Sequence, residues 1–149
     1  MIPETEALPR HERFQQLYRN LSASTVNKES LGQCYHPDIQ FQDPFHQVSG
    51  LDVLTQYFAA MYENVSYIHF EFHRSWQQDN TSFIRWTMSY RHPKLYAGKQ
   101  VIHVEGGSEL IWRDDLIIDH RDFFDGGNML YEHLPVLGWA IRKLKGRML

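Results

Sequence analysis

The chain has 149 residues, of which 42% are hydrophobic and 14% aromatic, so we predict one domain with its own apolar core and exclude a largely disordered chain. Fifteen Lys and Arg against eighteen Asp and Glu give a formal charge of −3, and without a basic excess general nucleic-acid binding is disfavoured. The single cysteine, Cys34, excludes an internal disulfide, and no export signal or membrane-spanning run is visible, so we expect a soluble, cytoplasmic protein.

The first part of the chain predicts two helices and a strand. Apolar residues recur at i, i+3, i+4 and i+7 over residues 14–21, which predicts an amphipathic helix of about three turns. A shorter helix around residues 31–35 must end near His36, because the residue before Pro37 is pushed out of helical geometry. Residues 39–43 alternate in polarity and predict a strand.

A third helix and a series of long strands follow. Ser49 and Asp52 have the spacing of a capping box, so the helix should start there and continue for about four turns. From Tyr67 onward the apolar period changes to two residues, which is typical of strands. We predict strands over residues 67–76, 83–91, 98–112 and 116–125. A Gly-Gly pair at 106–107 predicts a bulge or bend in the third of them.

The turn at residues 79–80 leaves two registers open for the first two of these strands. A two-residue loop places Arg85 on the same face as Phe70 and Phe72, inside the fold. A three-residue loop places Arg85 beside His73 on the opposite, polar face. The alternation of apolar residues slightly favours the second register.

Helices followed by antiparallel strands indicate an α+β domain, a curved sheet with helices on one side, and we expect one domain over residues 1–149. Residues 127–149 form a basic amphipathic helical tail, which closes a cavity, packs on a second subunit or makes weak contact with a membrane surface. The aromatic face of residues 86–90, with Trp86, Met88 and Tyr90, favours a homodimer.

Asp43 is the most informative carboxylate of the first half. Alternation from Ile39 and Phe41 directs its side chain toward the apolar interior. A carboxylate that has lost its hydration is a stronger proton acceptor, which suits removal of a proton from a weak carbon acid. The alternative is that Asp43 caps the turn at Pro44 and faces water.

His120 and Asp122 lie on one apolar face of the last strand, together with Leu116 and Phe124. Two ionisable side chains two residues apart on such a face can orient one another, or a water molecule, for acid/base work. The alternative is a buried histidine–aspartate hydrogen bond with a structural role only.

The sequence offers little support for metal or nucleotide chemistry. His69 and His73 are i and i+4 on a strand, about 13 Å apart at the usual rise per residue, too far for one ion to bridge. Phosphate-binding glycine loops and nucleophile motifs are not visible. We therefore expect no metal and no cofactor.

Several segments resemble the nuclear-transport-factor-2-like superfamily, above all its SnoaL-like polyketide cyclases and limonene-epoxide hydrolases. They are residues 35–45 (YHPDIQFQDPF), 50–52 (GLD), 62–64 (YEN) and 116–125 (LIIDHRDFFD), and the resemblance extends over about residues 10–126. It implies a cone-shaped barrel in which a strongly curved antiparallel sheet wraps around the N-terminal helices and encloses a pocket.

The ketosteroid isomerases of this superfamily imply one assignment of roles. Their general base is the aspartate of a similar Asp-Pro step, which corresponds to Asp43. Tyr18 stands in for the tyrosine of their first helix, and the position of their second acid falls on or near Ser108.

The limonene-epoxide hydrolases imply a different assignment. Asp122 matches their last acid and Arg85 their arginine, whereas Thr87 stands where an aspartate belongs. Their water-holding tyrosine and asparagine correspond to Phe41 and Asp43. In the SnoaL-like cyclases the aspartate of the last strand is the acid/base, which again corresponds to Asp122.

We therefore predict a homodimer that binds a small apolar molecule and performs cofactor-free isomerisation, cyclisation or hydration with Asp122 and Asp43, assisted by His120. The alternative is a non-catalytic ligand-binding or homodimerisation module of the same fold. The ligand-binding residues expected from sequence are Tyr18, Phe41, Phe58, Tyr62, Arg85, Ser108 and Phe124.

Overall fold

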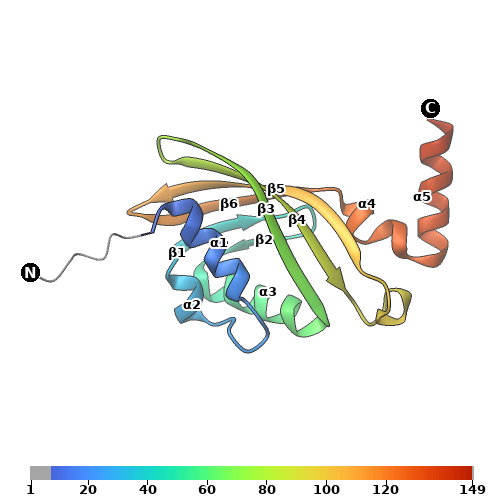
Figure 1. Ribbon diagram of the computed structural model, residues 1–149, viewed down its shortest axis with the longest axis horizontal. Helices are drawn as coiled ribbons and strands as arrows, with labels where there is room; N and C mark the ends of the chain where they lie inside the picture. Colours follow the sequence, from blue (N-terminus) through green and yellow to red (C-terminus); the bar gives the residue numbers. More distant parts are fainter. Residues whose placement is uncertain (1–7, 149) are drawn as a thin grey trace, which may run out of the picture.

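The computed structural model describes residues 8–148 and consists of one curved six-stranded sheet with helices on one side (Figure 1). The strands are β1 (Tyr35–Gln42), β2 (Gln47–Ser49), β3 (Tyr67–Gln78), β4 (Thr81–Arg91), β5 (Ile102–Arg113) and β6 (Leu116–Phe124). The helices are α1 (Arg10–Asn20), α2 (Lys28–Gly32), α3 (Leu51–Asn64), α4 (Gly126–Met129) and α5 (Pro135–Arg147), with short 3₁₀ turns η1 (Tyr96–Gly98) and η2 (Tyr131–His133). The predicted α+β class is confirmed.

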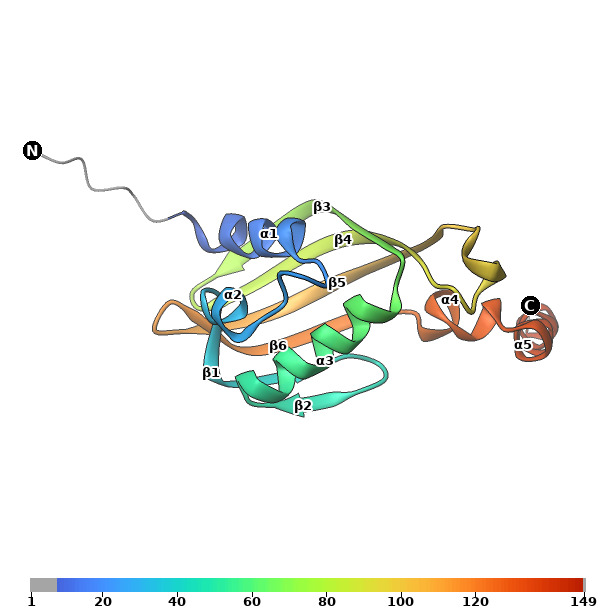
Figure 2. The same cartoon turned by 90° about the horizontal axis from the view of Figure 1, so that it is seen from below.

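The sheet has the order β2-β1-β6-β5-β4-β3. Its long strands are antiparallel, but β1 runs parallel to β6, and this pairing was not predicted. Figure 2 shows α1, α2 and α3 against the concave side of the sheet. The parallel pair sets Phe41 opposite His120, which brings the Asp43 turn to the end of the last strand.

The two helix boundaries predicted from local signals need correction. The first strand, β1, already starts at Tyr35, so α2 ends at Gly32 and not near His36, and its capping box is formed by Asn27 and Ser30. The predicted capping box at Ser49 is absent: Gly50 precedes α3 without a side-chain cap. Ser49 belongs instead to β2, and its Oγ donates to the side-chain oxygen of Gln40 at 2.6 Å.

The register of β3 and β4 combines both alternatives left open by the sequence. The loop has two residues, because Gln78 pairs with Thr81. A β-bulge between Phe72 and Ser75 then adds one residue to β3 and reverses the faces beyond it. As a result Phe72 pairs with Trp86 on the inner side, and Arg85 points outward.

Of the bulge or bend predicted at the Gly-Gly pair, the bulge is wrong, because pairing is continuous through Gly106 and Gly107 on both sides of β5. The glycines instead make room for rings. A Cβ on Gly106 would collide with the indole of Trp86 and lie 2.7 Å from the carbonyl oxygen of Phe123, and one on Gly107 would collide with the ring of Phe83.

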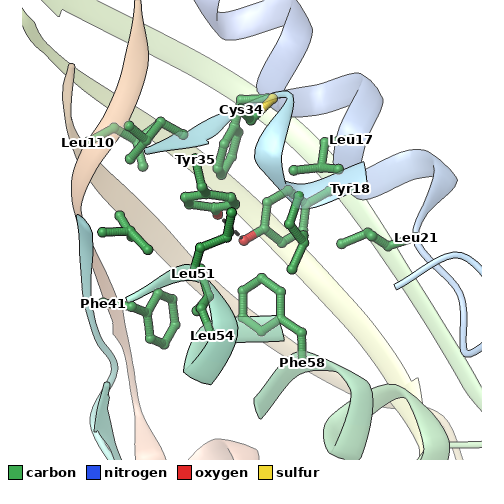
Figure 3. Packing of buried hydrophobic residues seen from close by; sticks show 14 of the residues in the cluster. Leu17, Tyr18, Leu21, Cys34, Tyr35, Phe41, Leu51, Leu54, Phe58 and Leu110 are labelled. Carbon is green, nitrogen blue, oxygen red and sulfur yellow. Dashed lines mark hydrogen bonds between the residues drawn. The ribbon is translucent and has the colours of Figure 1, made fainter. Parts of the chain in front are cut away.

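The core has two parts. The first lies under α1, α2 and α3, where the rings and methyl groups of the three helices meet the sheet (Figure 3). The second lies toward the tail and contains Trp86, Met88 and Tyr90. These three side chains are buried, so the aromatic face that the sequence assigned to a dimer surface is part of the interior.

The first part of the tail, α4, packs on the sheet, whereas its last part, α5, extends from the end of the molecule. Asp125 caps α4 by accepting hydrogen bonds from the backbone of Gly127 and Asn128. Tyr90 Oη donates to the carbonyl of Met129 and so holds α4 on β4. Beyond η2, α5 stands at the end of the molecule opposite the first described residues (Figure 1).

Candidate functional site

A pocket opens between α3, the inner face of the sheet and the start of the tail. Its outer part has a volume of about 580 Å³ and is mainly apolar. A small inner part of about 60 Å³ shares five lining residues with it and therefore adjoins it. The shared residues are Phe45, Tyr57, Met61, Met88 and Met129. The inner part contains the carboxylates of Asp43 and Asp122 in otherwise aromatic and aliphatic surroundings.

Asp122 is held at the inner end by two neighbouring side chains. Ser108, its cross-strand partner on β5, donates from Oγ to Asp122 Oδ1 at 2.5 Å. His120 Nε2 lies 2.6 Å from the same oxygen. Trp86 Nε1 in turn donates to Ser108 Oγ at 2.9 Å. None of the described groups donates to the second oxygen of Asp122, Oδ2, so this oxygen remains available to a bound molecule.

A chain of hydrogen bonds continues from His120 into the core. Its Nδ1 lies 2.8 Å from Tyr35 Oη, and Tyr35 Oη lies 2.8 Å from Tyr18 Oη. Figure 3 shows the two phenol oxygens facing each other across the buried cluster. His120 itself is 1% exposed, so its orientation is fixed by these partners and not by water.

One proton arrangement satisfies every member of this chain when Asp122 is ionised. A carboxylate only accepts, so His120 carries its proton on Nε2. Nδ1 then accepts from the hydroxyl of Tyr35, and Tyr35 accepts from the hydroxyl of Tyr18. The tautomer of His120 is thereby set by the tyrosine on one side and the carboxylate on the other.

The phenols around the inner pocket stay protonated. Burial raises the pKa of Tyr18 and Tyr35 well above the usual value, and the nearby charge of Asp122 raises both further. Burial also raises the pKa of Tyr57, with its hydrogen bond to Asp43 acting in the same direction. These tyrosines are therefore hydrogen-bond donors at neutral pH.

Asp43 directly follows Gln42, the register partner of Arg121, and therefore lies beside Asp122 in the lining of the inner pocket. Both of its oxygens are engaged. Oδ1 accepts from the backbone N–H of Phe45 at 2.8 Å and of His46 at 2.7 Å. Oδ2 accepts from the hydroxyl of Tyr57. The side chain caps the turn, as one alternative had it, but it is 7% exposed and does not face water.

A surface hollow of about 480 Å³ beside the ends of β1 and β6 is lined by both carboxylates. Asp122 remains 18% exposed in its side chain, in contrast to the enclosed ring of His120. The carboxylate thus has access to solvent protons while it faces the apolar pocket.

Four of the expected pocket residues, Tyr18, Phe41, Phe58 and Phe124, line the inner pocket together with both carboxylates. Ser108 is buried behind Asp122 and acts on it through a hydrogen bond. Tyr62 is buried in the core, and its hydroxyl has no partner among the described residues.

Arg85 is the one expected pocket residue that the structure moves to the other side of the sheet. It is exposed and lines an outer hollow together with His73 and Thr87. The bulge in β3 is the physical reason, because it reverses the faces between the turn and the pocket. An arginine for epoxide or anion activation is therefore not supplied to the pocket by this residue.

Sequence reasoning missed three residues of the site. Tyr35 was assigned to a helix stripe and Trp86 to a dimer surface, although both join the hydrogen-bond chain to Asp122. Tyr57, which contacts Asp43 and lines both parts of the pocket, was not singled out. Its place four residues before Met61 on the buried side of α3 is the signal that could have found it.

The residues described give no grouping of three His, Cys, Asp or Glu side chains suited to a metal ion. His69, Glu71 and His73 are exposed on the outer face of β3. Cys34 is buried, and burial raises its pKa to about 11.

What the inner pocket offers chemically is a fixed carboxylate, neutral phenol donors and an apolar wall, a set suited to moving protons.

Comparison with known proteins adds a family. A family model described as a SnoaL-like domain matches residues 14–120. A search of curated proteins found none similar in sequence.

Solved structures resemble the chain in fold. A putative SnoaL-like polyketide cyclase from Jannaschia sp. superposes with a TM-score of 0.66 at 13% identity, covering 78% of this chain and 85% of its own. An NTF2-like protein of unknown function from Burkholderia pseudomallei gives 0.68 at 9% identity, covering 81% and 94%. An LEH-like epoxide hydrolase from M. tuberculosis gives 0.63 at 16% identity, covering 80% and 83%. At these identities the likeness concerns the fold.

Proposed function

The chain belongs to the SnoaL-like domain family, and from that premise we propose that it catalyses cofactor-independent proton transfer on a small apolar molecule, with Asp122 as the base. The products of such a step are those of an isomerisation, a cyclisation or a hydration. The observation that carries the proposal is the free oxygen of Asp122 at the inner end of an apolar pocket, with its other oxygen held by His120 and Ser108.

Holding one oxygen and leaving the other free is what a general base requires. The two hydrogen bonds to Oδ1 fix the plane of the carboxyl group, so Oδ2 meets a bound molecule in one orientation. A carbon-bound proton transferred to Oδ2 leaves its electron pair on the substrate, where it spreads onto a conjugated oxygen as an enolate. Returning the proton to another atom of the substrate completes an isomerisation with no external reagent.

The negative charge formed on the substrate needs a donor. Tyr18 and Tyr57 line the inner pocket, and both keep their protons because their pKa values are raised. A neutral phenol in a water-poor site stabilises an oxyanion by donating a hydrogen bond. Tyr18 donates its one proton to Tyr35, so we assign this role to Tyr57, whose hydroxyl donates to Asp43 in the free protein and would turn to the substrate oxygen when the oxyanion forms. Asp43 is then the residue that positions Tyr57.

The volume and lining of the outer cavity support a proposal for the class of ligand. About 580 Å³ of mainly apolar space fits a ligand of one to three small rings more readily than a charged metabolite. We propose a cyclic or aromatic ketone, or a related carbon acid, because its apolar body would fill the outer part while its acidic carbon reaches Asp122.

The test follows proton exchange rather than a particular product. β-Tetralone in D₂O is incubated with the protein, and loss of the signal of its acidic C–H is followed by proton NMR. We expect exchange faster than in buffer, because deuterons reach Asp122 through the hollow at the ends of β1 and β6. Asp122→Asn should remove the acceleration, and Asp119→Asn, the same change on the same strand outside the pocket, should retain it.

A panel of related cyclic ketones extends the test if β-tetralone does not fit. Exchange at the buffer rate across the panel, or full exchange by Asp122→Asn, would contradict the catalytic proposal.

A second candidate function is binding without turnover. It is favoured by the volume and apolar character of the outer cavity, which needs no carboxylate to hold a ligand. Under this function β-tetralone would bind wild type and Asp122→Asn equally, as measured by calorimetry, while neither protein accelerates exchange.

A further inference from the structure

The tail helix α5 leaves a set of apolar side chains uncovered. Leu137, the half-buried Ile141, Leu144 and the C-cap residue Met148 follow the i, i+4, i+7, i+11 spacing of one helix face. Leu144 is 60% exposed and Met148 79%. Val136 is 80% exposed on a neighbouring face. A helix that belonged wholly to the core of one domain would have these side chains covered.

The attachment of α5 to the body uses a different face. Gly138 packs so closely on Glu132 that a Cβ would collide with its carbonyl. Arg142 donates to the same carbonyl at 2.6 Å, and Lys145 forms an ion pair with the carboxylate of Glu132. These contacts place the helix across the end of the molecule, as Figures 1 and 2 show, with the rest of its circumference turned away from the body.

The charge of α5 is opposite to that of the chain. The helix contains four cations and no acid, in a chain with a formal charge of −3. The cations are Arg142, Lys143, Lys145 and Arg147. Trp139 is 58% exposed, and the ammonium group of Lys143 lies 4.8 Å from its ring. Exposed apolar side chains interspersed with lysine, arginine and tryptophan are the composition of helices that lie in the interface of a bilayer.

We propose that α5 docks this protein on the surface of an anionic lipid bilayer. Lys143 and Arg147, which do not contact Glu132, reach the phosphate groups with their long side chains. The exposed apolar side chains of Val136, Leu137 and Leu144 enter the region below the phosphates. Pairing of α5 with α5 of a second copy is disfavoured because it would set four cations of each helix against four of the other. No helix within residues 8–148 is long and apolar enough to cross a bilayer, so the contact is with the surface.

Docking in this way would bring the pocket to the membrane. Met129, Leu130 and Leu134, just before α5, line the outer cavity. An apolar ligand dissolved in the bilayer would then meet the cavity directly. This consequence rests on the proposed function, whereas the docking itself does not.

The test is flotation of the full chain with lipid vesicles. The probes are vesicles of phosphatidylcholine alone and vesicles in which part of it is replaced by phosphatidylglycerol. We expect flotation only with the phosphatidylglycerol vesicles and a decrease as salt is added, because screening weakens the attraction.

Two pairs of substitutions separate charge from apolar insertion. Lys143→Gln with Arg147→Gln should weaken vesicle binding about twenty-fivefold, at about fivefold for each cation near the surface. Val136→Gln with Leu144→Gln should also weaken it, although the charge is unchanged. Both pairs leave the contacts with Glu132 in place.

The matched control is Arg74→Gln with Arg121→Gln, an equal loss of charge at exposed positions of the sheet. It should bind the vesicles as wild type does, and circular dichroism checks that every variant is folded. The proposal is overturned if wild type floats with neither vesicle, or if the control loses as much binding as the α5 variants. It is also overturned if light scattering shows a dimer that Val136→Gln with Leu144→Gln converts to a monomer, since α5 would then be covered by a second copy.

Discussion

Asp122 and Asp43 line one small cavity from the adjacent ends of β6 and β1 and are held in opposite ways. Asp122 lines the pocket with one oxygen fixed by side chains of β5 and β6 and the other without a hydrogen-bond partner among the described residues. Asp43 has one oxygen fixed by two backbone N–H groups and the other by the hydroxyl of Tyr57. A carboxylate with a free oxygen can react, whereas a saturated one holds other groups in place. Burial alone, which the two share, does not distinguish them.

The largest expected effect separates the two acids by activity. General-base catalysis contributes about 10²–10⁴-fold, so Asp122→Asn should slow the exchange of β-tetralone by that factor. Asp43→Asn keeps an amide oxygen for the N–H groups of Phe45 and His46 and should remain within about tenfold of wild type. The measurement is the NMR exchange rate for both variants under the same conditions.

Equal losses in the two variants would contradict this division of roles. In that case Asp43 would take part in proton transfer after releasing Tyr57, and the exchange by Tyr57→Phe, in which Asp43 Oδ2 is already free, would be expected to rise.

The next effect separates the acids by stability. Asp43→Ala leaves two backbone N–H groups and a half-buried phenol without their acceptor, and we expect a loss of about 2–3 kcal/mol in the free energy of unfolding. Asp43→Asn should lose less, because one amide oxygen still accepts both N–H groups. Urea unfolding of both variants and wild type gives the comparison. A loss below about 0.5 kcal/mol for Asp43→Ala, the level of an ordinary surface change, would show that the turn does not depend on its cap.

A third substitution, Gly106→Ala, acts on Asp122 indirectly, through Trp86 and Ser108, and leaves the contacts of Asp43 unchanged. In Gly106→Ala the new methyl group meets the ring of Trp86 and the backbone oxygen of Phe123, and only the ring can move. We expect a loss of about 1–3 kcal/mol in the free energy of unfolding, as for an overpacked core, together with slower exchange, because Trp86 also holds Ser108.

The matched control is Gly146→Ala in α5, where an added Cβ meets nothing within 4 Å. Alanine favours a helix over glycine, so this variant should be as stable as wild type or slightly more stable. If both alanine variants unfold alike in urea, the close approach of Trp86 to Gly106 has no energetic weight.

The sequence predicts the orientation of a side chain where local alternation determines it, and fails where a long-range contact or a bulge does. Alternation along β6 placed His120 and Asp122 on the inner face, and the structure agrees because that strand pairs regularly near the site. The side of the sheet on which Arg85 lies depends on one extra residue in β3. The composition of a polar segment does not indicate where such a bulge occurs.

The same limit applies to the hydrogen bonds of the site. Tyr35 reaches His120 from a strand that pairs in parallel with β6, a contact between segments 85 residues apart that no local pattern specifies. The Gly-Gly pair of β5 does mark an unusual position, but space for an aromatic ring and a break in pairing both favour glycine, so the residue type alone does not distinguish them.

The smallest expected effect comes from the thiol of Cys34, which is buried but does not line the pocket of the two acids. Burial raises the pKa of the Cys34 thiol to about 11, and the charge of Arg13 acts in the opposite direction. Because the folded state disfavours the thiolate, this contribution to stability is complete below pH 9 and is lost as the pH rises from about 9 to about 11. Wild type should therefore lose stability relative to Cys34→Ala over that range, while the titration of the tyrosines, common to both proteins, cancels. The check is urea unfolding of the two proteins at pH values on either side of the range, and a constant difference between them would mean that the thiol is not shielded as its burial indicates.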